Sequence, residues 1–194
     1  MKASTIESKF PLLAVEYGCI ISKDADITVA FRIDLPELFT VTSAEYEAIH
    51  AAWVKAVKVL PYYSVVHKQD WFVSEKYHPQ TGDGDMSFLS RSYERHFNER
   101  PFLSHSCYLF LTKTTKDRMR MQSNFSSLCR GNIIPKEVDT ETAVKFLEAV
   151  GQFERIVNDS GFITITRLTD DEITGTADNA GLTEKYFALS PEDT

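Results

Sequence analysis

The stretch FLSHSCYLFLTKT, residues 102–114, decides the fold that the sequence predicts. Its second half is an almost continuous apolar run, which is typical of a strand that is covered on both faces. We therefore expect these residues to form a central strand of a sheet. The segments before and after it in the chain then predict which elements surround that strand.

Two amphipathic helices are predicted, one before and one after this strand. The first begins after Thr42, because Thr42 and Glu45 have the spacing of a capping box, and it ends before Pro61. The second runs from about residue 140 to Gly161, a glycine typical of a helix end. We expect the apolar face of each helix to lie against the sheet. These faces consist of Tyr46, Ile49, Trp53, Val57 and Leu60, and of Val144, Leu147, Val150 and Phe153.

The remaining β-rich runs complete an α+β fold. They cover residues 27–35, 62–77 and 162–168, and a strand meander precedes the first of them. If a helix inserted after residue 87 is left out, the order is βαββαβ, the ferredoxin-like plan of a mostly antiparallel sheet with helices packed on it. We expect one domain over residues 1–168 and a peripheral tail over residues 169–194.

The inserted helix, which Pro101 ends, has an apolar and a charged face. Met86, Leu89, Tyr93 and Phe97 share the apolar face, and we expect Phe97 to belong to the core. The opposite face carries both signs of charge, which is typical of a solvated helix that finds docking partners. Its candidate partner-binding residues are Arg91 and Arg95.

The charge of the chain is uneven. The formal net charge is −7, but residues 113–136 hold six basic side chains against Asp117 alone and so carry +5, which leaves −12 for the rest. A net negative charge disfavours general binding to polyanions. We therefore expect this segment to be a solvated connection or a site for an acidic protein, rather than for DNA. The candidate residues are Lys113, Lys116, Arg118, Arg120 and Arg130.

The sequence predicts no catalytic residue, metal site or cofactor. No glycine precedes a lysine as a phosphate-binding loop requires, and the GDGD stretch at residues 82–85 is typical of a surface loop. The five histidines have no metal-ligand spacing. Cys129 beside Arg130 is the most reactive candidate thiol, but no base can be assigned to it.

The compartment is predicted to be reducing. Three cysteines without a C-x-x-C pair argue against a disulfide framework, and no apolar run is long enough to cross a bilayer. We expect a cytoplasmic protein.

Several stretches together resemble the N-terminal region of the TraG family of conjugative-transposon ATPases, the VirB-type motors of type IV secretion systems. The likeness extends from about Glu7 to Thr176. The stretches that carry it include LPELFTVTSAEYEAIH, LPYYSVVHKQDWF, MSFLSRSYERHFNERPFLSHSCYLFLTKTTK, RMQSNFSSLCRG and FLEAVGQFERIVNDSGF.

The resemblance implies a non-catalytic interaction and assembly domain for DNA transfer. In that family the nucleotide-binding core lies C-terminal to the matched region, so ATP and Mg²⁺ are implied only for a domain that this sequence does not contain. The implied partners are other secretion components, the C-terminal ATPase domain and neighbouring motor subunits. The implied location is the cytoplasmic face of the inner membrane, by peripheral association. An alternative is an independent nucleic-acid-binding module that uses residues 113–136.

Overall fold

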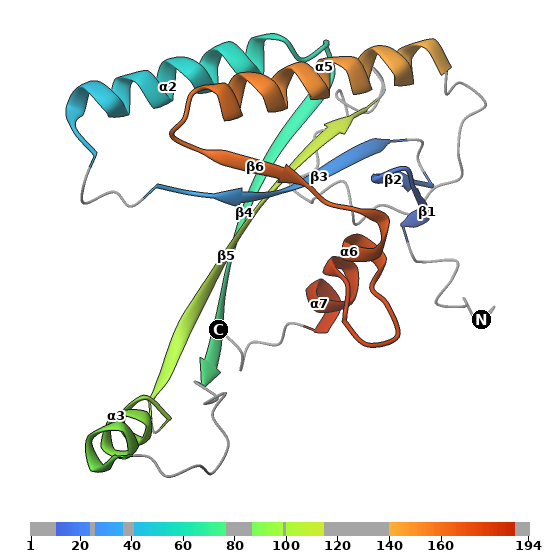
Figure 1. Cartoon of the computed structure of the whole chain (residues 1–194). Helices are drawn as coiled ribbons and strands as arrows, with labels where there is room; N and C mark the ends of the chain where they lie inside the picture. The colour runs from blue at the N-terminus through green and yellow to red at the C-terminus, as the bar shows by residue number, and fades with distance from the viewer. Residues whose placement is uncertain are drawn as a thin grey trace, which may run out of the picture. The chain divides into compact units, whose positions relative to one another are not determined.

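A six-stranded sheet organises the described part of the chain (Figure 1). The computed structural model describes residues 11–23, 26–36, 41–76, 87–98, 100–114 and 140–188. The strands are β1 (Leu12–Glu16), β2 (Cys19–Ser22), β3 (Ile27–Asp34), β4 (Ser64–Lys76), β5 (Pro101–Lys113) and β6 (Thr164–Arg167). The helices are α2 (Ser43–Lys58), α3 (Phe88–Asn98), α5 (Thr140–Asp159), α6 (Asp170–Thr174) and α7 (Leu182–Ala188).

Strand β3 is the organising strand of the sheet. The strand order is β1-β2-β3-β5-β4, and β6 pairs with β3 outside this path. Strand β5 pairs with residues 27–33 of β3. The other edge of β3 is shared, because β2 pairs with residues 27–29 and β6 with residues 31–34. The pairs β1–β2, β2–β3, β3–β5 and β3–β6 are all antiparallel.

The predicted fold class is confirmed. If α3 is left out, the elements from β3 to β6 follow the order βαββαβ, and their strands lie in the order β6-β3-β5-β4. This is the ferredoxin-like plan. The meander of β1, β2 and β3 and the helix inserted between β4 and β5 are also present. Strand β5 lies between β3 and β4, so its predicted interior position is confirmed.

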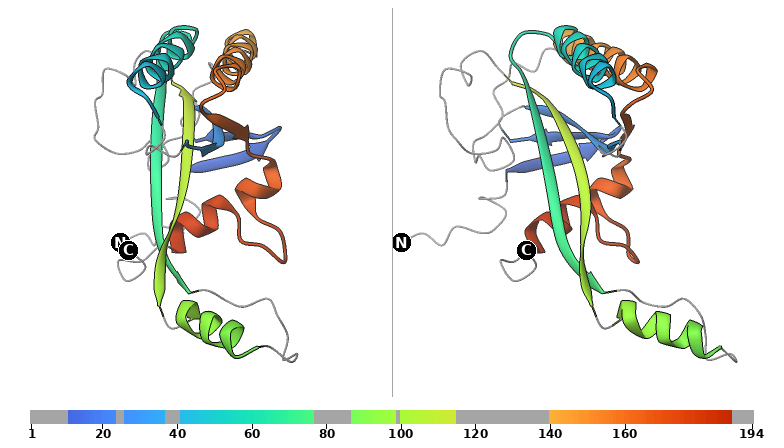
Figure 2. Two further views of the ribbon diagram at one scale, coloured as in Figure 1. Left: turned by 60° about the vertical axis from the view of Figure 1, so that its left-hand side comes forward. Right: turned by 90° about the vertical axis from the view of Figure 1, so that its left-hand side faces the viewer.

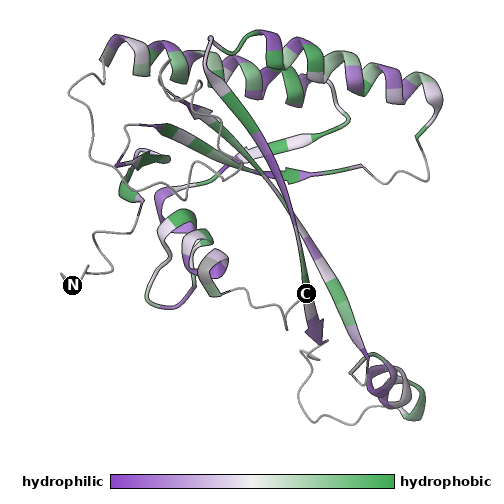
Figure 3. Ribbon diagram, turned by 180° about the vertical axis from the view of Figure 1, so that it is seen from behind, coloured by the Kyte–Doolittle hydropathy of each residue, from purple (hydrophilic) through white to green (hydrophobic). Residues whose placement is uncertain are grey.

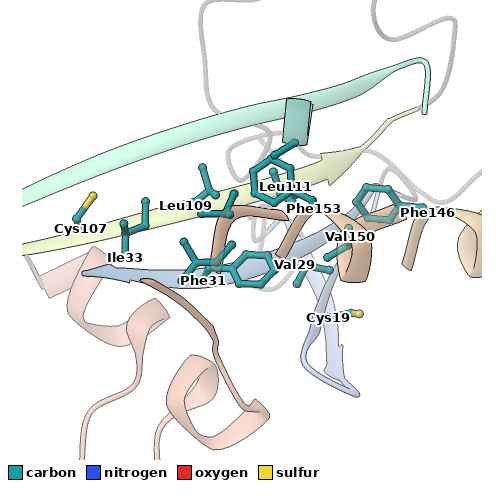
Figure 4. Close-up of a cluster of buried hydrophobic side chains, with 13 residues drawn as sticks. Cys19, Val29, Phe31, Ile33, Cys107, Leu109, Leu111, Phe146, Val150 and Phe153 are labelled. Carbon is teal, nitrogen blue, oxygen red and sulfur yellow. The ribbon is translucent and has the colours of Figure 1, made fainter. Parts of the chain in front are cut away.

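One core lies between the sheet and the helices α2 and α5, which lie on the same side of the sheet (Figure 2). Every second residue of β3 and β5 points into this core, because side chains alternate along a strand. The rings of Trp53 and Phe153 meet edge to face with centroids 5.6 Å apart and join α2 to α5. The buried residues, several of which are labelled in Figure 4, are Cys19, Val29, Phe31, Ile33, Ala56, Cys107, Leu109, Leu111, Phe146, Val150, Phe153, Val157 and Ile165.

Both long helices begin outside this core. Helix α2 starts with the predicted capping box, in which Glu45 N donates to Thr42 Oγ1 (3.3 Å) and Thr42 N donates to Glu45 Oε2 (2.7 Å). Tyr46 near the start of α2 is 63% exposed, and Val144 near the start of α5 is 49% exposed. Val57, which follows the buried Ala56, is 37% exposed. The prediction that these three side chains pack inward is therefore wrong. Only later turns reach the core, such as the turn of α2 that buries Ala56.

The chain after β6 forms two short helices. A second capping box starts α6, since Glu172 N donates to Thr169 Oγ1 (3.3 Å) and Thr169 N donates to Glu172 Oε2 (2.9 Å). Ile173 in α6 and Leu182 in α7 are both buried, so this region contributes side chains to the packed interior. The division into a domain of residues 1–168 and a tail of residues 169–194 stays a prediction.

The chain divides into two compact units. Unit 1 comprises residues 1–69 and 107–187, and unit 2 comprises residues 70–106 and 188–194. The core described above belongs to unit 1, and α3 belongs to unit 2. Within the described ranges, no helix is long and apolar enough to cross a membrane.

Candidate interaction surface

Large hydrophobic side chains are exposed on α3. Its apolar side presents Leu89 (78% exposed), Tyr93 (67%) and Phe97 (43%), and we call these three residues the α3 apolar face. Phe88 is 82% exposed as well, but a rotation of about 100° per residue places it on the side of Arg91 and Arg95. Figure 3 shows the mixture of hydrophobic and hydrophilic residues along this helix. The sequence predicted Leu89, Tyr93 and Phe97 correctly as one side of a helix, and Met86, the fourth predicted residue of this face, lies outside the described residues. The prediction that Phe97 belongs to the core is wrong, because apolar spacing does not indicate what covers the face.

The backbone and rings of α3 hold this face in a defined arrangement. At the start of the helix, Ser90 N donates to Ser87 Oγ at 3.2 Å, and Arg91 N donates to the Ser87 carbonyl oxygen at 3.0 Å. This is the bonding of a serine N-cap. The rings of Tyr93 and Phe97, one turn apart, have centroids 4.6 Å apart. His96 meets Phe97 edge to face at 5.5 Å, so Phe97 contacts two neighbouring rings.

The two predicted partner-binding arginines of α3 lie away from this face. Arg91 and Arg95 are exposed, and a rotation of about 100° per residue places them on the opposite side of the helix from Leu89 and Tyr93. Charged side chains therefore flank the α3 apolar face without interrupting it. A role for these arginines in binding stays a prediction.

A second exposed cluster lies on the part of β4 and β5 that belongs to unit 2. His105 Nε2 is 2.9 Å from Asp70 Oδ1, and its ring stacks on Phe72 with centroids 4.7 Å apart and an interplanar angle of 14°. Phe72 is 51% exposed, and Leu103 is 63% exposed. Sequence reasoning missed this cluster, because it depends on the register between two strands that a long connection joins.

Lys113 is the one predicted residue of the basic segment that the structure describes. Its Nζ donates to the Tyr62 carbonyl oxygen at 2.6 Å and lies 5.3 Å from the centre of the Tyr63 ring. Burial lowers the pKa of this ammonium from its ordinary value. Tyr63 has a left-handed backbone (φ 63°), and its carbonyl oxygen accepts a hydrogen bond from Thr114 N at 3.0 Å. Lys113 thus stabilises the turn before β4.

The other four basic candidates, Lys116, Arg118, Arg120 and Arg130, lie outside the described residues. The GDGD stretch at residues 82–85 and Cys129 do so as well.

The described cysteines belong to the core rather than to a reactive site. Cys19 and Cys107 are free and buried. Burial raises the pKa of the Cys19 thiol, although the nearby Arg167 acts in the opposite direction. In the part of the chain that the structure describes, no group of three or more His, Cys, Asp or Glu side chains could hold a metal ion.

A cavity of about 370 Å³ lies within unit 1 beside α6 and α7. Arg32 of β3 and Tyr108 of β5, which are cross-strand partners, contribute to its wall. Arg32 Nη1 is 3.8 Å from Glu172 Oε1, and both side chains are about half exposed. Lys185 and Asp171 also line it, so its charges balance and favour no one sign of ligand.

Comparison with known proteins identifies a family match for the N-terminal part only. Residues 1–51 match the family described as "Domain of unknown function, B. Theta Gene description (DUF3875)". No match to a curated protein was found. The matched region includes β1, β2, β3 and the start of α2, and it ends before α3.

Proposed function

We propose that this chain is a non-catalytic interaction and assembly domain of a conjugative transfer ATPase in a type IV secretion system. The observation that carries the proposal is the exposure of the α3 apolar face, whose three large side chains range from 43% to 78% exposed. Contiguous exposed apolar surface on a folded protein is typical of a binding site for another macromolecule.

The conjugative context is supported by the sequence resemblance. The longest stretch that resembles the TraG family covers residues 86–116, which include all of α3. The interaction surface therefore lies inside the segment with the likeness. In this proposal a separate C-terminal domain binds ATP and Mg²⁺, and the present chain contacts secretion components, that domain or neighbouring motor subunits at the cytoplasmic face of the inner membrane.

The proposal is tested by recovery of secretion components from donor cells. The tagged chain is crosslinked and purified, either as wild type or as a variant with both Leu89→Asp and Tyr93→Asp. Charges on the α3 apolar face should reduce recovery of these components by about tenfold or more, because central apolar residues dominate binding energy. The matched control is Tyr46→Asp, which places the same charge at a 63% exposed tyrosine of α2 and should leave recovery unchanged.

Two results would count against the proposal. The first is equal recovery of secretion components by the wild type and the double variant. The second is ATP hydrolysis by the purified 194-residue chain that is free of contaminating enzyme.

A further inference from the structure

We propose that strand β4 pairs antiparallel with strand β4 of a second copy of this chain, around a twofold axis beside Gln69. The pairing would join two sheets edge to edge through main-chain hydrogen bonds, which is one of the common ways in which strands bind a partner. The inference goes beyond the proposed function, because it does not use the α3 apolar face.

Strand β4 offers a long edge for such a pairing. It lies at one end of the strand order, and in the described part of the chain its neighbour in the sheet is β5 alone. Its 13 residues exceed the ordinary strand length of about 5–6 residues. Val65 and Phe72 on this strand are 36% and 51% exposed. A long edge strand with exposed apolar side chains is a template on which another strand can pair.

The sequence of β4 is nearly symmetric about Gln69. Residues 64–74 read SVVHKQDWFVS, with a serine at each end and a valine next to each serine. In an antiparallel pair related by a twofold axis at Gln69, residues at equal distances from Gln69 lie opposite each other. The opposed pairs are Ser64 with Ser74, Val65 with Val73, Val66 with Phe72, His67 with Trp71, and Lys68 with Asp70.

The apolar members of these pairs suit each other. Aromatic and β-branched side chains that lie opposite each other on neighbouring strands stabilise a sheet. Phe72 of one copy would lie opposite Val66 of the other, and Val65 would lie opposite Val73. The pairing would therefore cover the two large apolar side chains that β4 leaves exposed in a single copy.

The charges of β4 select this register. Lys68 and Asp70 are the only residues between Ser64 and Ser74 with a formal charge at neutral pH, and the axis at Gln69 places each lysine opposite an aspartate. A slip of two residues, the smallest that keeps the same faces together, moves the axis to Lys68 or to Asp70. Two lysines or two aspartates would then lie opposite each other, which is unfavourable.

Asp70 is already held in place within one copy. His105 Nε2 of β5 lies 2.9 Å from Asp70 Oδ1. A carboxylate has two oxygens that can accept several hydrogen bonds, so Asp70 can meet Lys68 of the second copy and keep its contact with His105. A side chain that is held before binding loses less freedom when the partner arrives.

A buried polar atom lies beside the proposed axis. Gln69 Oε1 is buried, and within the described residues it has no hydrogen-bond partner. A buried acceptor without a partner costs stability. In the dimer the amide of Gln69 faces the same amide of the second copy, and each can donate one hydrogen bond and accept one. Pairing would thus give this side chain the partner that a single copy lacks.

Sedimentation equilibrium of the 194-residue chain tests the proposal over about 1–200 µM, a range that spans a micromolar Kd. An ionic strength of about 0.15 M screens the repulsion between two copies that each carry −7. The wild type should shift with concentration from 22.1 kDa to twice that mass. A wild-type chain that stays monomeric throughout, or that grows beyond twice this mass, would overturn the closed twofold pairing.

One charge reversal tests whether β4 forms the interface. Lys68→Asp should raise the Kd about tenfold or more, because two acidic side chains would then lie opposite each other. The matched control is Lys55→Asp, which makes the same change at an exposed lysine of α2 and should leave the Kd unchanged. A dimer that Lys68→Asp leaves intact would contradict the proposal.

A mixing experiment tests whether Lys68 meets Asp70. Lys68→Asp and Asp70→Lys should each dimerise poorly alone, because like charges would lie opposite each other. An equimolar mixture should restore the dimer, since two acidic side chains of one copy then lie opposite two basic side chains of the other. If the mixture stays monomeric, these two residues do not meet and the proposed register is wrong.

Cysteine crosslinking tests the position of the axis without a change of charge. In a Cys129→Ser background, where Cys19 and Cys107 are buried, Gln69→Cys should form a disulfide-linked dimer on oxidation. Opposed Cα atoms in an antiparallel pair are about 4.5–5.5 Å apart, within the range of a disulfide. Val73→Cys is the matched control, because the two copies of this residue would be about 27 Å apart. Crosslinking at residue 73 but not at residue 69 would overturn the register.

The α3 double variant separates this inference from the proposed function. The variant with both Leu89→Asp and Tyr93→Asp should dimerise as well as the wild type does, whether or not it recovers secretion components. If it is monomeric at all concentrations, the copies meet through α3 and the pairing of β4 is wrong.

Discussion

The carboxylate of Asp170 accepts a hydrogen bond from the backbone N–H of Gly18 at 2.5 Å, across 152 residues of sequence. Its other oxygen accepts one from the N–H of Tyr17 at 3.0 Å. The side chain of Arg167 adds a bond from Nη2 to the Tyr17 carbonyl oxygen at 2.9 Å. These bonds connect the turn between β1 and β2 to the start of α6, so the N-terminal meander and the C-terminal helices stabilise each other.

Removing the Asp170 carboxylate should therefore destabilise the whole chain. Asp170→Ala leaves two N–H groups without their acceptor, and we expect the free energy of unfolding to fall by about 1–3 kcal/mol. The neighbouring Asp171 lies in the same helical turn and is exposed. Asp171→Ala is the matched control, with an expected change within about 0.5 kcal/mol. Urea unfolding measures both, and equal losses would show that the bonds to Gly18 and Tyr17 contribute little.

The close approach at Gly18 leads to a second expectation. Gly18 has φ +67°, and a Cβ at this position would lie 3.1 Å from Arg167 Nε and 3.2 Å from the Leu168 carbonyl oxygen. Gly161 has φ +73° with no atom within 4 Å of such a Cβ. Both Gly→Ala variants should lose about 1–2 kcal/mol from the left-handed backbone. Gly18→Ala should lose more stability than Gly161→Ala, because only Gly18 is crowded. A thermal unfolding experiment in which Gly161→Ala melts at the lower temperature would contradict this crowding.

Alanine substitutions of one phenylalanine in the core and one on the α3 apolar face should differ in their effect on stability. Phe153 is fully buried between α2, α5 and the sheet, and Phe153→Ala should cost about 3–5 kcal/mol through lost burial and a cavity. Phe97 is 43% exposed, so Phe97→Ala should cost about 1 kcal/mol or less. Urea unfolding of the two variants compares these losses directly. A large loss for Phe97→Ala would mean that this ring is buried in solution.

Glu172 should make the stability of α6 depend on pH. Its pKa is lowered from 4.5, first by the backbone N–H of Thr169 and then by the Thr169 hydroxyl and Arg32. A lowered pKa in the folded state means that the ionised group stabilises the fold above its unfolded pKa. This contribution is lost as the pH falls through the folded pKa. Glu172→Gln should thus be less stable than wild type at pH 7 and equally stable well below pH 4.5, as measured by urea unfolding.

The stability of wild type and of Glu172→Gln can be compared at pH 7 and well below pH 4.5. If the two proteins differ by the same free energy of unfolding at both pH values, the Glu172 charge does not have this role.

The sequence predicted those parts of the fold that depend on local patterns. The capping box of Thr42 and Glu45 and the apolar run of β5 each indicate one element, and their order then indicates the ferredoxin-like plan. It could not predict which apolar faces are covered. Leu89 and Tyr93 have the helical spacing of core residues, yet the structure leaves them exposed, because burial depends on what packs against a face.

Contacts between distant segments were also beyond sequence reasoning. The pair of Asp70 and His105 requires the register of β4 against β5, and the bond of Asp170 to Gly18 requires two ends of the fold to meet. Lys113 was predicted to bind a partner because of its charge alone. The sequence could not predict its bond to the Tyr62 carbonyl oxygen, because this bond depends on the turn before β4.

The frequency of conjugative transfer tests most directly whether the chain acts through the α3 apolar face. Donor cells that depend on this chain would carry the wild type, the double variant Leu89→Asp and Tyr93→Asp, or the control Tyr46→Asp, all at equal protein levels. We expect transfer by the double variant to fall about tenfold or more, with the control equal to wild type. Wild-type transfer by the double variant would contradict an assembly role for this helix.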